Sequence, residues 1–161
     1  MFLAVWSGEP AKAELLARRG ANPNRRMMLA GFVDVSAMEM AVATRNNEMI
    51  RALVHGGVDV NTKNREGLTA LSWASMMGLP AQVRELLALG ANVNHADTFG
   101  MTPLLWASLI DHGSYGSIET LVKAGADVKA RTKSGETALA LVKKWQQPDA
   151  PRALQQAGAP E

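Results

Sequence analysis

The three histidines are the first candidates for acid–base or metal chemistry, because an imidazole can hold a proton or a metal ion near neutral pH. They are His55, His95 and His112. Each lies in a different sequence context, so their spacing is not that of a ligand cluster. His95 precedes Asp97 by two residues. Two interpretations of that pair stay open, a metal-binding or acid–base site and a solvated loop residue.

Nucleophilic and phosphate-binding chemistry lacks its usual sequence signatures. The chain has no cysteine, and it contains no GxxxxGK[ST], GxGxxG or HExxH motif. Ser72, Ser75 and Ser108 have no histidine at matching positions, so they indicate helix packing instead. Carboxylates are scattered singly and are not paired on one face. We therefore expect no enzymatic activity, no cofactor and no metal.

The composition is that of a soluble globular protein. The 161 residues are 47% hydrophobic and 20% charged, with a formal net charge of +2. No apolar run approaches the ~20 residues that cross a bilayer, and the apolar start is too short for a signal peptide. The compartment stays open, with the cytoplasm favoured. The small positive charge is weak evidence for nucleic acid.

A repeated phrase organises the whole chain. It consists of apolar residues, two variable residues and then Gly-Ala-Asn/Asp-x-Asn, as in LLALGANVN at 86–94. Its glycines lie at Gly20, Gly57, Gly90, Gly125 and Gly158. These glycines follow apolar runs of helical spacing. We therefore expect them at the left-handed position just after a helix, where a Cβ is costly.

A second phrase lies between the copies of the first. It reads NREGLTALSWAS at 64–75 and DTFGMTPLLWAS at 97–108, with a weaker copy at 132–143. Thr69, Thr102 and Thr137 precede its apolar runs and are expected to cap helices. Pro10, Pro80 and Pro148 share one later position, which predicts the first turn of a second helix.

These phrases resemble the ankyrin repeat, whose pattern is Asp-x-x-Gly-x-Thr-Pro-Leu-His-x-Ala followed by Leu-Leu-x-x-Gly-Ala-Asp-Val-Asn. The best copy matches it at Asp97, Gly100, Thr102, Pro103, Leu104 and Ala107. Ser72 and Leu105 stand where the family has histidine. The resemblance covers essentially the whole chain. It implies an all-α, ankyrin-type α-solenoid of helix–turn–helix units with short β-hairpin or finger loops.

We expect a single ankyrin-repeat domain over 1–161, with units near 1–24, 25–61, 62–94, 95–129 and 130–161. First helices are predicted near 37–45, 70–77, 103–110 and 138–145. Second helices are predicted near 11–19, 47–56, 80–89, 117–124 and 149–156. Because the chain begins inside a unit, either an upstream domain has been removed or the first unit is an atypical terminal repeat.

The resemblance also implies a partner-binding surface, made of hairpin tips and of first-helix positions that face a concave groove. Its candidate residues are Lys63, Arg65, Glu66, Met76, Met77, Thr98, Phe99, Met101, Leu109, Ile110, Arg131, Lys133 and Trp145. Many are apolar where polar side chains are usual. Either they form an exposed apolar stripe for a partner, or some fold inward while Trp6 and Trp145 cover the two ends. Trp73 and Trp106 are expected in the core.

The finger tips are mostly basic, with Lys63 and Arg65 on one and Arg131 and Lys133 on another. Either these cations meet an acidic protein surface, or they are solvated residues that prevent sheet pairing. Nucleic acid is disfavoured because aromatic residues do not alternate with the cations. We expect a non-catalytic module, monomeric alone and part of a larger protein, that binds an apolar or amphipathic and acidic protein segment. The alternative is a structural or self-associating scaffold.

Overall fold

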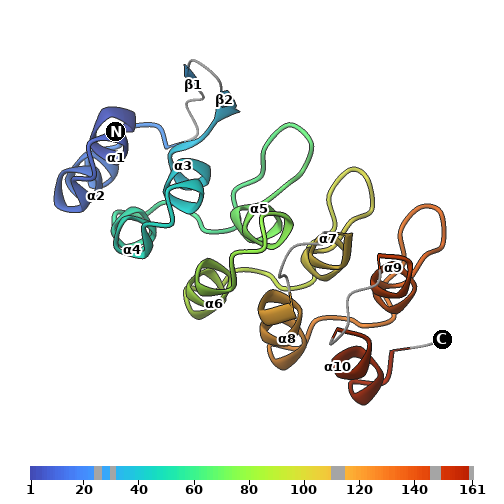
Figure 1. Ribbon diagram of the computed structural model, residues 1–161. Coiled ribbons are helices and arrows are strands. Elements are labelled where there is room, and N and C mark those ends of the chain that lie inside the picture. The colour runs from blue at the N-terminus through green and yellow to red at the C-terminus, as the bar shows by residue number, and fades with distance from the viewer. Residues whose placement is uncertain (24–26, 30–31, 110–114, 146–149, 160–161) are drawn as a thin grey trace. The chain divides into compact units, whose positions relative to one another are not determined.

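The computed structural model describes residues 1–23, 27–29, 32–109, 115–145 and 150–159 (Figure 1). The fold is all-α with ankyrin-type helix pairs, as the sequence predicts. The chain divides into two compact units, Met1–Thr62 and Lys63–Glu161, which are described separately. None of the helices in the described ranges is long and apolar enough to span a membrane.

The N-terminal unit contains two helix pairs and a short hairpin. The first pair is α1 (Phe2–Trp6) and α2 (Pro10–Arg18), and the second is α3 (Ala37–Ala43) and α4 (Asn47–His55). Helix α2 packs along α4, and α1 packs on α3. Between the pairs, β1 (Met27–Leu29) and β2 (Phe32–Val35) run antiparallel, with Met27 opposite Val35. The sequence indicates extra residues here but does not predict strands.

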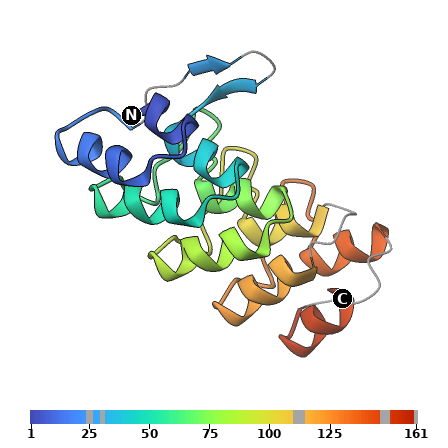
Figure 2. The same cartoon turned by 60° about the vertical axis from the view of Figure 1, so that its left-hand side comes forward.

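The C-terminal unit stacks three helix pairs. Its first helices are α5 (Ala70–Met76), α7 (Pro103–Leu109) and α9 (Ala138–Lys144). Its second helices are α6 (Pro80–Ala88), α8 (Tyr115–Lys123) and α10 (Ala150–Gln156). Figure 1 and Figure 2 show the two rows side by side, α5–α7–α9 and α6–α8–α10. Fully buried leucines and Ile118 between the rows form the core.

The local signals that start and end the helices are those expected from sequence. The hydroxyls of Thr69 and Thr137 accept hydrogen bonds from the backbone N–H groups of Ser72 and Ala140, and cap α5 and α9. Pro10 and Pro80 begin α2 and α6, while Pro148 lies outside the described residues. All five repeat glycines have positive φ, for example +89° at Gly90. The repeat phase is therefore correct.

Three differences from the predicted elements are small. Helix α1 was not anticipated, and α8 begins at Tyr115 instead of residue 117. Arg45 has φ = 56° at the turn between α3 and α4, where Gly8 and Gly78 occupy the equivalent turns. A residue with a side chain is strained in this left-handed conformation. The turn at Arg45 therefore lacks the glycine that the equivalent turns have.

Candidate protein-binding surface

Three loops precede α5, α7 and α9 and project from the first-helix row of the C-terminal unit (Figure 1). We call them the α5 finger (63–68), the α7 finger (96–101) and the α9 finger (131–136). Neighbouring fingers are hydrogen-bonded to each other. Thr98 donates its N–H and its hydroxyl to the Glu66 carbonyl at 3.0 and 2.7 Å. Lys133 Nζ donates to the Thr98 carbonyl at 2.6 Å. The fingers therefore form a connected row.

Glycines allow the fingers to approach this closely. Gly67 and Gly100 have φ near +79° and +77°. A Cβ on Gly67 would lie 3.1 Å from the Thr98 nitrogen, and one on Gly100 would lie 3.3 Å from Lys133 Cγ. Glycine supplies both the left-handed backbone and the missing side chain at these positions. The glycine of the second sequence phrase thus allows each finger to pack closely against the next one.

Asp97 organises the α7 finger. Its Oδ1 accepts the N–H groups of Phe99 at 2.8 Å and Met101 at 3.0 Å. Its Oδ2 accepts the indole N–H of Trp106 at 2.7 Å. One carboxylate thus ties the finger to the helix behind it, and Phe99 projects outward with 53% of its surface exposed. Trp106 is only half-buried, and its indole N–H is hydrogen-bonded to a carboxylate. The expectation that it lies in the core is therefore wrong.

The α5 finger repeats this design with one missing contact. Asn64 Oδ1 accepts the N–H groups of Glu66 at 3.0 Å and Leu68 at 2.9 Å. Asn64 lies nine residues before Trp73, as Asp97 lies nine before Trp106. An amide has no second oxygen to accept an indole N–H. Among the described residues the buried Trp73 Nε1 has no hydrogen-bond partner, and Trp73, like Trp106, is only half-buried.

His95 makes a structural contact with the neighbouring finger. Its Nε2 lies 2.8 Å from the Gly67 carbonyl, which accepts the imidazole N–H and joins two fingers. Asp97 directs its two oxygens to the finger and to Trp106. In the described ranges no group of three His, Cys, Asp or Glu could hold a metal ion. His95 is half-buried and bonded to the neighbouring finger, so it is not a freely solvated loop residue.

The α9 finger neutralises part of its own charge. Lys144 Nζ lies 3.1 Å from Glu136 Oε1, and Ser134 donates its hydroxyl to the same carboxylate. These hydrogen bonds, Lys144 first, hold the pKa of Glu136 below its usual range, and the Lys144 charge adds to the effect. Arg131 donates to the Gly135 carbonyl at 2.8 Å. Most polar groups of this finger therefore bind within the finger or to α9.

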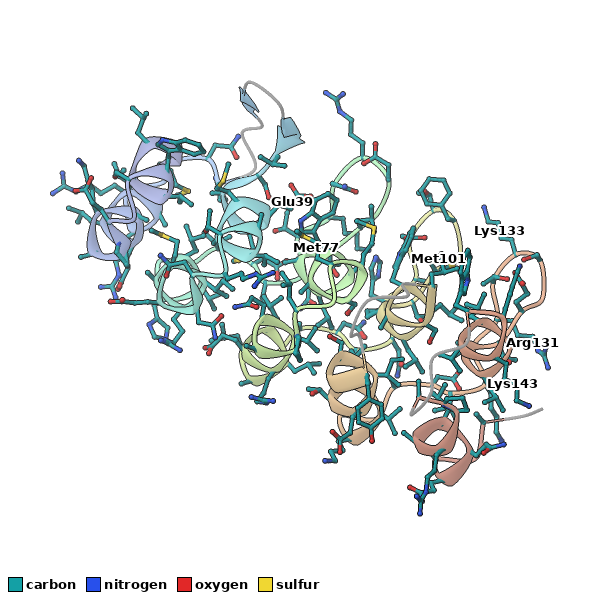
Figure 3. All side chains as sticks on the ribbon, viewed as in Figure 1. Glu39, Met77, Met101, Arg131, Lys133 and Lys143 are labelled. Atoms are coloured by element: carbon teal, nitrogen blue, oxygen red, sulfur yellow. The ribbon has the colours of Figure 1, made fainter. Side chains whose placement is uncertain are left out.

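The structure places the sequence-predicted apolar residues in three different environments. Met77, labelled in Figure 3, is exposed at the end of α5. Trp145 at the end of α9 and Phe99 on its finger are exposed as well. Met76 and Leu109 are half-buried. Met101 is only 6% exposed and is not part of a solvent-facing stripe. The Asp97 carboxylate accepts its N–H at the base of the α7 finger. Ile110 lies outside the described residues.

The sequence-predicted polar candidates lie at the finger tips, as expected. Lys63, Arg65, Glu66, Thr98, Arg131 and Lys133 are all exposed. Figure 3 shows Lys133 on the α9 finger and Lys143 farther along the same unit. Sequence reasoning missed the bonds that connect the fingers and the Asp97–Trp106 bond. The signal that could have revealed the Asp97–Trp106 bond is the nine-residue spacing between a carboxylate and a tryptophan, whose indole N–H needs an acceptor.

Comparison with known families decides the identity of the repeat. The family model for ankyrin repeats (3 copies) matches residues 37–132, which are 96 of the 161 residues. The chain belongs to the ankyrin-repeat family. Ankyrin repeats generally serve as protein–protein interaction modules, and the family is typically non-catalytic. No curated protein matches the chain.

Proposed function

We propose that this ankyrin-repeat chain binds a partner protein through the fingers and the first-helix ends of its C-terminal unit. The exposed aromatic and thioether side chains on one row carry the proposal. Phe99, Met77 and Trp145 are three of the seven large hydrophobic side chains that are exposed in the described part of the chain. Aromatic and methionine side chains are enriched at the centres of protein interfaces, where they bury much area.

Charge supports an acidic partner segment. Six exposed cations accompany the apolar residues, and they are Lys63, Arg65, Arg131, Lys133, Lys143 and Lys144. Only two exposed or half-buried acids, Glu66 and Glu136, lie on the same fingers, and Lys144 pairs with the second. The surface is therefore positive. An amphipathic segment with apolar and acidic side chains complements both features.

The size of the surface sets the expected affinity. Full burial of one large apolar side chain contributes about 1.5–3 kcal/mol, and these three are about half exposed, which leaves roughly 2–5 kcal/mol. Charge-assisted contacts add to this, while association and side-chain ordering oppose it. The balance gives a micromolar complex rather than a nanomolar one. Screening of the cations by salt mainly lowers the association rate.

The rigid finger row favours a partner that fits a preformed surface. The bonds among Glu66, Thr98 and Lys133 fix the spacing of the fingers before any partner arrives. Less conformational entropy is then lost on binding. The ammonium of Lys133 is already bonded to the Thr98 carbonyl, so it contributes less to the attraction of an acidic partner than the other five cations.

The test is a selection from a displayed peptide library followed by affinity measurement on the selected peptides. Wild-type chain should enrich acidic, apolar peptides. The double variant Met77→Glu/Phe99→Glu should weaken their binding at least about tenfold, because two apolar contacts become repulsive. Tyr115→Glu is the matched control, since Tyr115 is an exposed aromatic residue on α8 in the other helix row. Equal losses in the control and in the double variant would contradict the proposal.

A further inference from the structure

The exposed charges of the three fingers follow an order along the row. The α5 finger carries the exposed cations Lys63 and Arg65, and the α9 finger carries Arg131 and Lys133. The α7 finger lies between them (Figure 1), and its exposed side chains are uncharged. The largest of these is Phe99, which is 53% exposed. Two basic fingers therefore flank one apolar finger.

The acidic groups of the three fingers do not cancel this order. Asp97 in the α7 finger is buried, and its two oxygens accept N–H groups of the same finger and of α7. Glu136 in the α9 finger is paired with Lys144 at 3.1 Å. Glu66 is exposed, but it stands against two cations on the α5 finger. The outer fingers therefore keep a positive excess.

Contacts between the fingers fix their spacing. The Glu66 carbonyl accepts the Thr98 hydroxyl at 2.7 Å, and the Thr98 carbonyl accepts the Lys133 ammonium at 2.6 Å. Behind the fingers, α7 packs against both α5 and α9. Packed helices lie about 8–10 Å apart, so each basic finger lies roughly that distance from the apolar one.

An extended peptide matches this spacing better than a helix does. An extended chain advances about 3.3 Å per residue, so three residues cover one finger spacing. A bound helix needs a continuous apolar stripe on the surface that receives it. The structure describes all of residues 63–68, 96–101 and 131–136, and in these three fingers Phe99 is the one large apolar side chain that is exposed. The fingers therefore offer one apolar contact between two charged ones.

We propose that the fingers bind an extended peptide in which one apolar residue has an acidic residue three positions to each side. The proposal rests on the proposed function and specifies the partner sequence that the same surface selects. The apolar side chain packs on Phe99, and the two carboxylates meet the cations of the α5 and α9 fingers. A carboxylate in the central place would instead face the electron-rich ring of Phe99 and lie near the charge of Asp97.

Two peptides of identical composition test the order of the residues. ESPLSPE places leucine between the acids, whereas EESPSPL places both acids at one end. Both peptides are acetylated and amidated, and their Ser-Pro pairs favour an extended backbone and exclude a helix. Titration of the full chain, followed by amide NMR shifts, should give ESPLSPE a dissociation constant on the order of 10⁻⁴ M. EESPSPL should bind about fivefold more weakly, because it loses one exposed ion pair.

Charge-reversed variants assign the two ends of the peptide. Lys63→Glu and Arg131→Glu should each weaken ESPLSPE binding about threefold to tenfold. The peptide KSPLSPE should restore binding to one of these variants, and ESPLSPK should restore it to the other. Arg152→Glu is the matched control, because it makes the same charge change at an exposed position on α10 in the other helix row. It should leave ESPLSPE binding unchanged, and far-UV circular dichroism checks that each variant is folded.

The outcomes separate this inference from the proposed function. Shifts confined to the three fingers, with ESPLSPE preferred, support both. Equal binding of the two isomers at the fingers, or rescue of both variants by the same lysine peptide, would overturn the inference and leave a protein-binding function standing. Failure of both isomers to bind would also overturn it. The proposed function would then be decided by the library selection and its Met77→Glu/Phe99→Glu variant.

Discussion

Replacing Asn64 with Asp would give the α5 finger the carboxylate that the α7 finger already has. Asp97 uses one oxygen for the finger backbone and the other for Trp106, at 2.7 Å. Asn64 uses its only side-chain oxygen for the backbone, and the buried Trp73 Nε1 has no partner within the described residues. Asn64→Asp should therefore form a Trp73 hydrogen bond without changing the shape of the finger.

The expected gain is about 1 kcal/mol. An unsatisfied buried donor costs ~1–3 kcal/mol, and a hydrogen bond to a charged group contributes ~1.5–3 kcal/mol. Partial desolvation of the new carboxylate opposes this, because Asn64 is half-buried. A chain of this size should melt roughly 2–4 °C higher for each kcal/mol. Urea unfolding followed by circular dichroism should show a higher midpoint with an unchanged slope.

A double-mutant cycle with Trp73→Phe identifies the source of any gain. Phenylalanine keeps most of the ring packing and removes the N–H. In that background Asn64→Asp should have no stabilising effect, because the new oxygen has nothing to accept. The reverse change, Asp97→Asn, should destabilise by about 1–2 kcal/mol because Trp106 loses its acceptor. Equal stabilisation by Asn64→Asp with and without the indole would refute the reasoning.

The remaining predictions concern packing, backbone and pH. Gly56→Ala should destabilise by about 1–3 kcal/mol in urea unfolding, because its Cβ would collide with Ala17 Cβ and force the helix pairs apart. Gly90→Val should also cost about 1–3 kcal/mol, although space is open around it, because φ is +89°. The lowered pKa of Glu136 means that its bonds stabilise the α9 finger above the ordinary carboxyl pKa and are lost as pH falls through the folded pKa. Lys144→Gln should raise that pKa in an NMR titration, and an unmoved pKa would show that Lys144 is not its main cause.

Local backbone chemistry made most of the fold predictable. A threonine cap, a proline in the first turn and a glycine just after the helix each act within a few residues, so their repeat spacing gives the helix bounds. The described helix ends agree with the predicted ones to within about two residues, which is the usual uncertainty of helix ends. The β1–β2 hairpin was missed because it interrupts the repeat.

The candidate surface was predictable only in part, because exposure depends on contacts between repeats. Met101 and Phe99 are both apolar finger residues two positions apart, and the N–H groups of both bond to Asp97, yet Met101 is buried and Phe99 is exposed. Lys133 looks like a free cation in the sequence, yet its ammonium reaches the neighbouring finger at Thr98, 35 residues away. A pattern read along the chain does not contain such contacts.

In the C-terminal unit, the side chains that stabilise the fold differ from those of the proposed binding surface. Leu104 and Leu139 hold the helix rows together and are almost fully buried. Thr98 donates its N–H and its hydroxyl to the Glu66 backbone carbonyl, so this contact between fingers does not depend on the side chain at position 66. The Phe99 side chain takes no part in these hydrogen bonds, and only its backbone N–H is bonded, to Asp97. Substitutions at position 99 that keep the backbone N–H should therefore leave the finger's shape unchanged, and under the proposed function the aromatic ring at this position serves contact with a partner.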